Sequence, residues 1–428
     1  MLRPLPRGAL SWSLYDLANT IFSMNVVTLF FSQWVIDDRG REDLWYSVTY
    51  STSMALVALT LPYLGLWSDR GGGRLRFLAV FTAVSVAATA LLGWLTRIPG
   101  DAGVLFALAA FALANYAFQG GLVFYNSLLP AVSTQATRGR VSGMGVALGY
   151  LGSFIGMFLV VPFVEGKLPI VNVAVPFIEP GGRAAAFLPT AILFGLFSLP
   201  IFLRVREPRR ARAARPTWSE AFRDLKATLA DSRRYPGVAT FLLANLLILD
   251  SVHTAIVFMA VYAQKVLGMP DSAKVVFFML ATIPAIGGSF VAGWLADRVG
   301  ARRVFVFTAW GWAASTFVIS LAAGDVVFYV MGGVLGALLG SLWTTTRPFL
   351  LSLTPEGEEG RVFGLYAFCN KSAAIVGPLV WGLTVWLAGS WETGKYRLAV
   401  ALLGVICAGG AALLRKVPRV EAGGAATR

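Results

Sequence analysis

Long runs of apolar residues, separated by short segments that carry most of the charge, dominate this sequence. A helix that crosses the hydrocarbon core of a bilayer needs about 20 predominantly apolar residues. Runs of about that length predict twelve membrane-spanning helices, over residues 11–36, 44–67, 75–96, 103–128, 141–164, 183–204, 237–266, 273–296, 302–323, 326–351, 362–388 and 396–415. The pattern therefore predicts an all-α membrane protein.

The composition agrees with this pattern and excludes several other classes of protein. Hydrophobic residues make up 57% of the 428 residues and charged residues only 14%, whereas about 25% of a soluble domain is charged. The net charge is +14, but the arginines lie between apolar runs, which indicates membrane topology and no nucleic-acid partner. With one histidine, two cysteines and no phosphate-binding loop, the sequence predicts neither a metal site nor a cofactor nor an enzyme active site.

The arginines also predict an orientation in the bilayer. They precede the first predicted helix and follow the second, fourth, eighth and twelfth. Loops that face the cytoplasm carry an excess of lysine and arginine. We therefore expect a multi-pass protein of the cell (inner) membrane with both termini in the cytoplasm.

A basic stretch in the middle of the chain divides it into predicted parts. These are an N-terminal half over residues 1–204, a cytoplasmic linker over 205–236 and a C-terminal half over 237–428. Within the linker, Thr217 and Glu220 have the spacing of a helix capping box, and apolar residues follow at helical spacing. The linker is therefore expected to contain an amphipathic helix.

Two similar motifs occupy the same place in the two halves. Residues 65–76 read GLWSDRGGGRLR, and residues 293–303 read GWLADRVGARR. Their aspartates, Asp69 and Asp297, are 228 positions apart (297 − 69 = 228). Glycine permits a sharp turn, and an aspartate at a helix end can make a contact that breaks when two halves move. A charge cluster that only fixes topology is the alternative, but the duplication favours a gating role.

The second motif resembles the loop signature of the major facilitator superfamily, G-x-L-A-D-R-x-G-R-[KR]. In that family the signature lies between helices 2 and 3 and again between helices 8 and 9. The resemblance implies two six-helix halves in parallel repeat, which transport a solute by alternating access. The residues that match the signature, and so are expected to act in gating, are Gly65, Asp69, Arg70, Gly293, Asp297, Arg298 and Gly300.

Ionisable residues inside bilayer helices are costly and usually functional. The first predicted helix reads DLANT from Asp16, and the seventh reads DSVHT from Asp250. The i, i+3 spacing puts each acid on one face with Asn19 or His253. Asp16 also lies near the start of its helix, where the helix dipole could satisfy its charge, so its role stays open. Asp250 with His253 is the stronger candidate for substrate binding or for coupling to protons.

Three other polar residues complete the predicted site. Asn115 and Gln119 share a face of the fourth predicted helix, and Lys371 lies deep in the eleventh. Lys371 could bind a substrate carboxylate or pair with an acid, or it could extend its ammonium group to the cytoplasmic surface. The candidates for substrate binding or coupling are therefore Asp16, Asn19, Asn115, Gln119, Asp250, His253 and Lys371.

The first predicted helix also resembles a narrower family. Residues 11–31, SWSLYDLANTIFSMNVVTLFF, resemble the opening of the Atg22-like, or UMF1-type, branch, whose pattern runs A-L-Y-D-W-A-N-S-A-F. The segments YNSLLP and GRVSGMGVALGYLG fit the same branch. For the fungal vacuolar members the resemblance implies export of amino acids.

We therefore expect a secondary active transporter, monomeric in the lipid bilayer, that moves a small polar organic solute. Amino-acid efflux is one form of this expectation, and protons are a candidate coupling ion. Two alternatives remain open from the sequence. One is an exporter of lipids or amphipathic drugs on the same fold, and the other is a non-transporting, receptor-like homologue.

Overall fold

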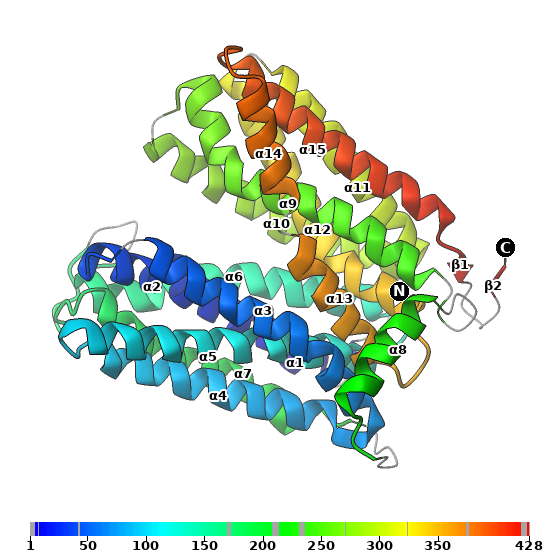
Figure 1. The fold of residues 1–428 in the computed structure, drawn as a ribbon, viewed down its shortest axis with the longest axis horizontal. Helices are drawn as coiled ribbons and strands as arrows, with labels where there is room; N and C mark the ends of the chain where they lie inside the picture. The colour runs from blue at the N-terminus through cyan, green and yellow to red at the C-terminus, as the bar shows by residue number, and fades with distance from the viewer. Residues whose placement is uncertain are drawn as a thin grey trace. The chain divides into compact units, whose positions relative to one another are not determined.

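Helices make up nearly all of the computed structural model. It describes residues 5–6, 8–41, 43–168, 173–207, 214–230, 235, 237–269, 271–322, 324–373, 376–420 and 426–427. The side chains of some helical residues within these ranges lie outside the description. The chain divides into two compact units (Figure 1). Unit 1 comprises Met1–Ser133 and Leu148–Pro216, and unit 2 comprises Thr134–Ala147 and Thr217–Arg428.

Unit 1 is a bundle of long helices. They are α1 (Ala9–Phe22), α3 (Asp43–Trp67), α4 (Arg74–Leu95), α5 (Gly100–Ser127), the later part of α6 (Arg138–Glu165) and α7 (Phe187–Arg204). Helix α4 packs against α5 and α7, α1 packs against α7, and α3 packs against α5. Aromatic side chains fill the core, where the rings of Phe31 and Phe111 stack with centroids 4.4 Å apart. Short 3-10 turns, η4 (Leu129–Val132) and η5 (Arg183–Ala186), join the helices.

The first predicted span differs from a regular helix. After α1 the chain continues as a π-helix, η1 (Ser23–Phe30), then as the short α2 (Phe31–Gln33) and a second π-helix, η2 (Trp34–Asp38). Hydrophobic periodicity does not distinguish a π-helix from an α-helix over so short a length, so the sequence predicts a single helix there. Such wide turns occur frequently at functional sites.

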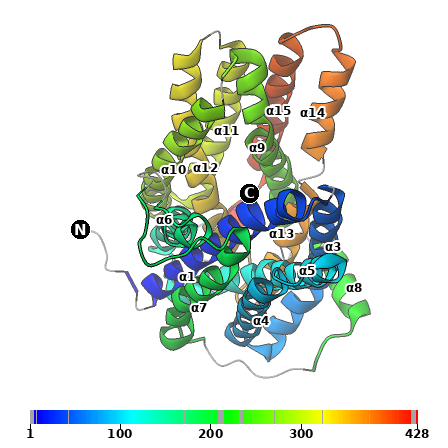
Figure 2. The same cartoon turned by 90° about the vertical axis from the view of Figure 1, so that its left-hand side faces the viewer.

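Unit 2 contains the remaining helices and the first turns of α6. They are α8 (Trp218–Ala230), α9 (Val238–Leu267), α10 (Asp271–Val299), α11 (Ala301–Leu321), α12 (Asp325–Ser352), α13 (Glu359–Ala373), α14 (Val376–Leu387) and α15 (Gly394–Leu413). Helix α15 packs against α9 and α11 (Figure 2). Helices α10 and α12 pack closely, because a Cβ on Gly336 would lie only 1.9 Å from the carbonyl oxygen of Ala281. The 3-10 turn η6 (Leu414–Lys416) and the two-residue strands β1 (Arg419–Val420) and β2 (Ala426–Thr427) follow.

The all-α prediction is confirmed. In the part of the chain that the structure describes, nine helical segments are long and apolar enough to cross a membrane. The span predicted over 362–388 contains two helices, α13 and α14. Pro378 is the third residue of α14, where proline fits because the first N–H groups of a helix have no intrahelical acceptor.

The predicted capping box is also confirmed. The backbone N–H of Glu220 donates to Oγ1 of Thr217 at 3.2 Å, and the N–H of Thr217 donates to Oε2 of Glu220 at 2.8 Å. These reciprocal bonds satisfy two donors that the start of α8 would otherwise leave unpaired. Helix α8 accordingly begins at Trp218.

Candidate functional site

Asp250 connects the middle of α9 to the start of α14. Its side chain is buried, and its Oδ1 accepts a hydrogen bond of 2.7 Å from the backbone N–H of Gly377. Gly377 is the second residue of α14. The start of a helix has unpaired N–H groups and a partial positive charge, so the position suits a carboxylate.

The packing around Gly377 leaves no room for a side chain. A Cβ at this position would lie 1.9 Å from Oγ1 of Thr254 and 2.8 Å from Oδ2 of Asp250. Both oxygen atoms are inaccessible to solvent, and neither has a hydrogen-bond partner among the described residues. Two buried polar atoms with unused hydrogen-bonding capacity thus meet at one point on α14.

Unit 1 contains a related arrangement. Oγ1 of Thr20 donates to the carbonyl oxygen of Asp16 at 3.0 Å. A Cβ on Gly149 of α6 would lie 3.1 Å from Oγ1 of Thr20 and 3.7 Å from the carbonyl oxygen of Asp16. In both units a threonine hydroxyl and the backbone carbonyl oxygen of the acid four residues earlier therefore lie near a glycine of another helix, but only in unit 2 does the carboxylate lie there too. The threonine hydroxyl is satisfied in unit 1, whereas that of Thr254 has no hydrogen-bond partner among the residues that the structure describes.

Asp16 and its neighbour Asn19 are both buried in α1. The first turn of α1 contains no acidic residue, so Asp16 lies beyond the part of the helix where the dipole acts. The Nδ2 atom of Asn19 is buried without a hydrogen-bond partner in the described part of the chain. These features favour a functional role for Asp16 over a simple interfacial charge.

His253 and Asp250 make contacts with different helices. The imidazole of His253 lies near the indole of Trp343 on α12, with ring centroids 5.9 Å apart, whereas the carboxylate of Asp250 is bonded to α14. One turn before Asp250, Nδ2 of Asn245 donates to Oδ1 of Asn370 on α13 at 3.0 Å. The polar residues of α9 therefore link it to α12, α13 and α14.

The remaining predicted site residues fall in different parts of the protein. In α5, Nδ2 of Asn115 donates to Oγ of Ser53 on α3 at 2.7 Å, and Gln119 is buried on the same helix. These two lie in unit 1, so they belong to a different group from Asp250. Lys371 is part of α13, but its side chain lies outside the described residues.

Sequence reasoning missed three candidate residues, one in unit 1 and two in unit 2. Asn25 in η1 is buried, and both polar atoms of its amide lack a partner among the described residues. Asn245 and Gly377 are the others. The two asparagines could have been found as single polar residues within apolar runs, but the role of Gly377 depends on which helix packs against it.

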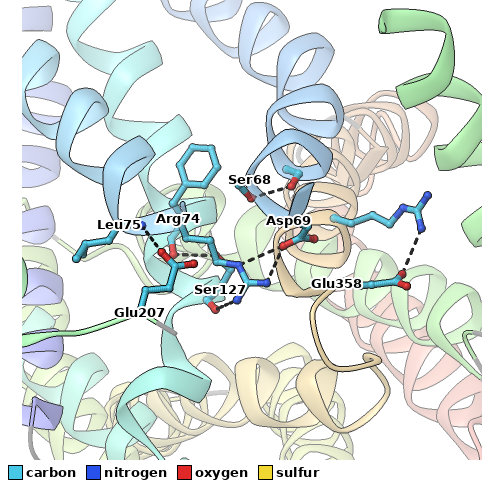
Figure 3. A network of polar contacts seen from close by, with 10 residues as sticks. Ser68, Asp69, Arg74, Leu75, Ser127, Glu207 and Glu358 are labelled. Atoms are coloured by element: carbon cyan, nitrogen blue, oxygen red, sulfur yellow. Dashed lines mark hydrogen bonds and ion pairs between the residues drawn. The ribbon is translucent and has the colours of Figure 1, made fainter. Parts of the chain in front are cut away.

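The first loop motif forms a buried ion pair within unit 1. Arg74 donates from Nη2 and Nε to Oδ1 of Asp69, at 2.7 and 3.2 Å, and from Nη1 to the carbonyl oxygen of Ser127 at 3.4 Å. Figure 3 shows Arg74 between these two groups. Oε2 of Glu207 accepts from the N–H of Leu75 at 3.1 Å, which satisfies a donor at the start of α4.

Other residues of the first motif form its turn. Oγ of Ser68 donates to the carbonyl oxygen of Gly65 at 2.7 Å, and the half-buried Arg70 lies in the π-helical turn η3 (Ser68–Gly72). Gly73 follows with φ of 80°, a value that favours glycine. The prediction that glycine makes the sharp turn is confirmed here.

The second motif contacts the start of α6. Oδ1 of Asp297 accepts from the N–H of Gly139 at 2.6 Å, and Oδ2 accepts from Nε of Arg140 at 2.8 Å. These residues all belong to unit 2. Close backbone packing makes the contact possible, because a Cβ on Gly293 would lie 2.6 Å from the carbonyl oxygen of Gly139.

The rest of the second motif is arranged around the turn into α11. The guanidinium of Arg298 lies over the ring of Trp294, 3.9 Å from its centroid. Gly300 precedes α11 with φ of 93°, so it too needs the conformational freedom of glycine. The two motifs are thus alike in their turns, but Asp69 pairs with an arginine of its own motif and Asp297 binds α6.

Comparison with known proteins identifies the family. Residues 45–422 match the family described as "Vacuole effluxer Atg22 like". This chain belongs to that Atg22-like family. An uncharacterized MFS-type transporter of Bacillus subtilis, YxiO, is 26% identical over 418 residues, which cover 95% of both chains. Autophagy-related protein 22 of Yarrowia lipolytica is 26% identical over 294 residues, 62% of this chain and 48% of the fungal protein.

Solved structures give the fold of this Atg22-like protein. The human organic anion transporter MFSD10 has a TM-score of 0.75 at 14% identity, covering 95% of this chain and 98% of the other. A bacterial homologue of the iron transporter ferroportin has a TM-score of 0.67 at 16% identity, covering 96% and 99%. The Atg22-like chain therefore has the major facilitator fold. Together with its relatives, this fold makes it a multi-pass transporter of the major facilitator type and not an enzyme.

Proposed function

We propose that this protein is a secondary active transporter that exports a small polar organic solute, with an amino acid as the leading candidate. It would act by alternating access in the cytoplasmic membrane, as a monomer with both termini in the cytoplasm. The observation that carries the proposal is a buried acid with a threonine one turn later on one helix of each unit, Asp16 with the half-buried Thr20 and Asp250 with the buried Thr254. Ionisable groups in a bilayer cost about 3 kcal/mol each or more, so they usually serve transport.

The buried amides favour a polar solute over a lipid. Asn19, Asn25 and Asn245 each bury at least one amide atom that has no partner in the described part of the structure. An unmade buried hydrogen bond costs about 1–3 kcal/mol, so the buried amides of each unit favour contact with polar groups of a solute over contact with a lipid tail. The direction of transport follows the family description, which names efflux.

The contacts of the two loop motifs are candidates for the gate. The carboxylate of Asp297 holds the first residues of α6, and Asp69 holds Arg74. Alternating access requires contacts that form in one state and break in the other. A buried ion pair with defined geometry suits such a contact, because the two charged groups that separate when it breaks can pair with other groups in the second state.

Counterflow into proteoliposomes tests the proposed function. The purified protein is reconstituted with unlabelled amino acids inside, and uptake of a panel of labelled amino acids is measured with and without an imposed ion gradient. We expect saturable uptake of one class of amino acid that is lost in Asp250→Ala. Thr217→Ala, which alters the exposed cap of α8, is the matched control and should transport normally.

Other outcomes would contradict the proposal in distinct ways. Uptake of amphipathic dyes or lipids, with none of the amino acids, would favour the lipid or drug exporter. Absence of counterflow for every compound, in protein that remains folded, would favour a receptor-like homologue. Equal uptake by the wild type and Asp250→Ala would exclude Asp250 from the solute path.

A further inference from the structure

We propose that Asp250 and Thr254 bind a sodium ion beside the start of α14. This assignment concerns binding of the ion alone. Its use as the coupling ion of solute export rests on the function proposed above. The two residues lie one helical turn apart on α9, and both are almost completely buried.

Three oxygen atoms converge on this position. A Cβ on Gly377 would lie 1.9 Å from Oγ1 of Thr254, 2.8 Å from Oδ2 of Asp250 and 3.0 Å from the carbonyl oxygen of Asp250. All three therefore face the same point on α14. Carboxylate, hydroxyl and carbonyl oxygens are the ligand types that hard cations prefer. Interrupted membrane helices are a common place for such ion sites.

Two side-chain oxygens of the cluster lack hydrogen-bond partners in the described part of the chain. Oδ2 of Asp250 and Oγ1 of Thr254 are buried and form no hydrogen bond with any described residue. Most buried polar atoms in folded proteins do have partners, so unsatisfied ones call for an explanation such as an ion. The N–H of Gly377 donates to the other carboxylate oxygen, so Oδ2 is the oxygen left for an ion.

The matching threonine of unit 1, Thr20, has a hydrogen-bond partner for its hydroxyl group. Thr20 donates to the carbonyl oxygen of Asp16, four residues earlier on the same helix. The equivalent acceptor for Thr254 is the carbonyl oxygen of Asp250, and no such bond forms. Oγ1 of Thr254 therefore stays available beside the same point on α14 as Oδ2 of Asp250, which adds a second oxygen ligand near the negative charge.

The chemistry of the cluster favours a monovalent metal ion. A buried carboxylate needs a compensating positive charge, and Asp250 has no ion pair with any described lysine or arginine. Within the described residues, no group of three histidine, cysteine, aspartate or glutamate side chains is suited to a multivalent metal. A sodium ion would neutralise the carboxylate and bind Oδ2 of Asp250 and Oγ1 of Thr254 together.

Thermal unfolding of the detergent-purified protein, without any solute, tests the assignment. Sodium chloride is titrated against choline chloride at constant ionic strength, because a ligand that binds only the folded state raises its stability in a saturable way. We expect a sodium-specific rise in the unfolding temperature of the wild type. Asp250→Asn should abolish this response. Thr254→Val should raise the half-saturating sodium concentration about tenfold, as expected for loss of one ligand.

Two further variants serve as controls. Thr254→Ser keeps the hydroxyl oxygen and should respond as the wild type does. Thr20→Val changes the matching residue of unit 1, whose hydroxyl is already satisfied, and should leave the sodium response unchanged. Because valine has nearly the shape of threonine, this series stays informative even if Asp250→Asn does not fold.

Several results would overturn the assignment. One is an equal response of the wild type to sodium and choline. Another is a half-saturating sodium concentration that is the same in the wild type and Thr254→Val. A response to pH alone, which sodium does not alter and Asp250→Asn removes, would identify a proton site instead. Since no solute is present, failure of this test leaves the counterflow test of export intact, and failure of counterflow leaves sodium binding intact.

Discussion

Oδ1 of Asp250 lies 2.7 Å from the backbone nitrogen of Gly377, and the two residues are 127 positions apart in the sequence. This bond places a carboxylate at the start of α14, where helix geometry favours a negative charge. It also requires α14 to approach α9 so closely that only glycine fits at the contact. The bond of Asp250 therefore requires a glycine at position 377, and each residue can be replaced separately to test this contact.

Gly377→Ala should destabilise the protein. The added Cβ would lie 1.9 Å from Oγ1 of Thr254, so α14 would have to move away from α9, and overpacking of this kind costs about 1–3 kcal/mol. We expect a lower unfolding temperature in detergent. Gly382→Ala is the matched control on the same helix, because a Cβ there meets no atom within 4 Å. Equal effects of the two changes would contradict the close packing.

Asn25→Leu should weaken binding of the solute without lowering the stability of the fold. The amide of Asn25 is buried with no partner among the described residues, and replacing such a group by an apolar one of similar shape is nearly neutral or stabilising. We expect an unchanged or higher unfolding temperature, together with about a tenfold weaker apparent affinity for the solute. Counterflow at varied solute concentration gives the affinity. A marked loss of stability with normal affinity would assign Asn25 a structural role.

Asp297→Asn should change which side of the transporter is open. The change keeps the size of the side chain but removes the charge that holds Nε of Arg140. We expect about a tenfold change in the labelling rate of single cysteines on one side of the membrane, equivalent to ~1.4 kcal/mol. The native Cys369 and Cys407 are replaced beforehand. Arg303→Ala, at an exposed position in the same motif, is the control. Unchanged labelling would leave Asp297 as a marker of topology.

Arg74→Lys should lower stability even though the charge is kept. Lysine cannot reproduce the two bonds to Asp69 and the bond to the carbonyl oxygen of Ser127 at once. Loss of one or two buried bonds of this kind corresponds to about 1–3 kcal/mol, which thermal unfolding in detergent can measure. The exposed Arg76, two residues later, provides the control Arg76→Lys. A stable Arg74→Lys variant would show that charge alone maintains this loop.

Much of the fold could be predicted from the sequence because its signals are local. Apolar runs indicated the helices, and the Thr217–Glu220 spacing indicated the start of α8. The turn glycines had a local signal too, since Gly73 and Gly300 lie beside charged loop residues. Each of these features depends on a few residues that are neighbours in the chain.

The contacts of the site could not be predicted in the same way. Asp69 and Asp297 lie in similar motifs but have different partners, because the partner depends on which helix packs alongside. The shared spacing of Asp250 and His253 indicates a common face, yet their described contacts are with α14 and α12. The π-helical turns around Asn25 likewise had no signal in the hydrophobic pattern.

The two carboxylate oxygens of Asp250 differ in their contacts, and this difference links the binding of an ion to the position of α14. One oxygen holds the N–H of Gly377, while the other is left for an occupant. An ion or proton on Oδ2 would draw negative charge from Oδ1 and so weaken the hydrogen bond that Oδ1 accepts from Gly377. Helix α14 has only 12 residues. Weakening of this one bond at its start would therefore allow the whole short helix to move away from α9.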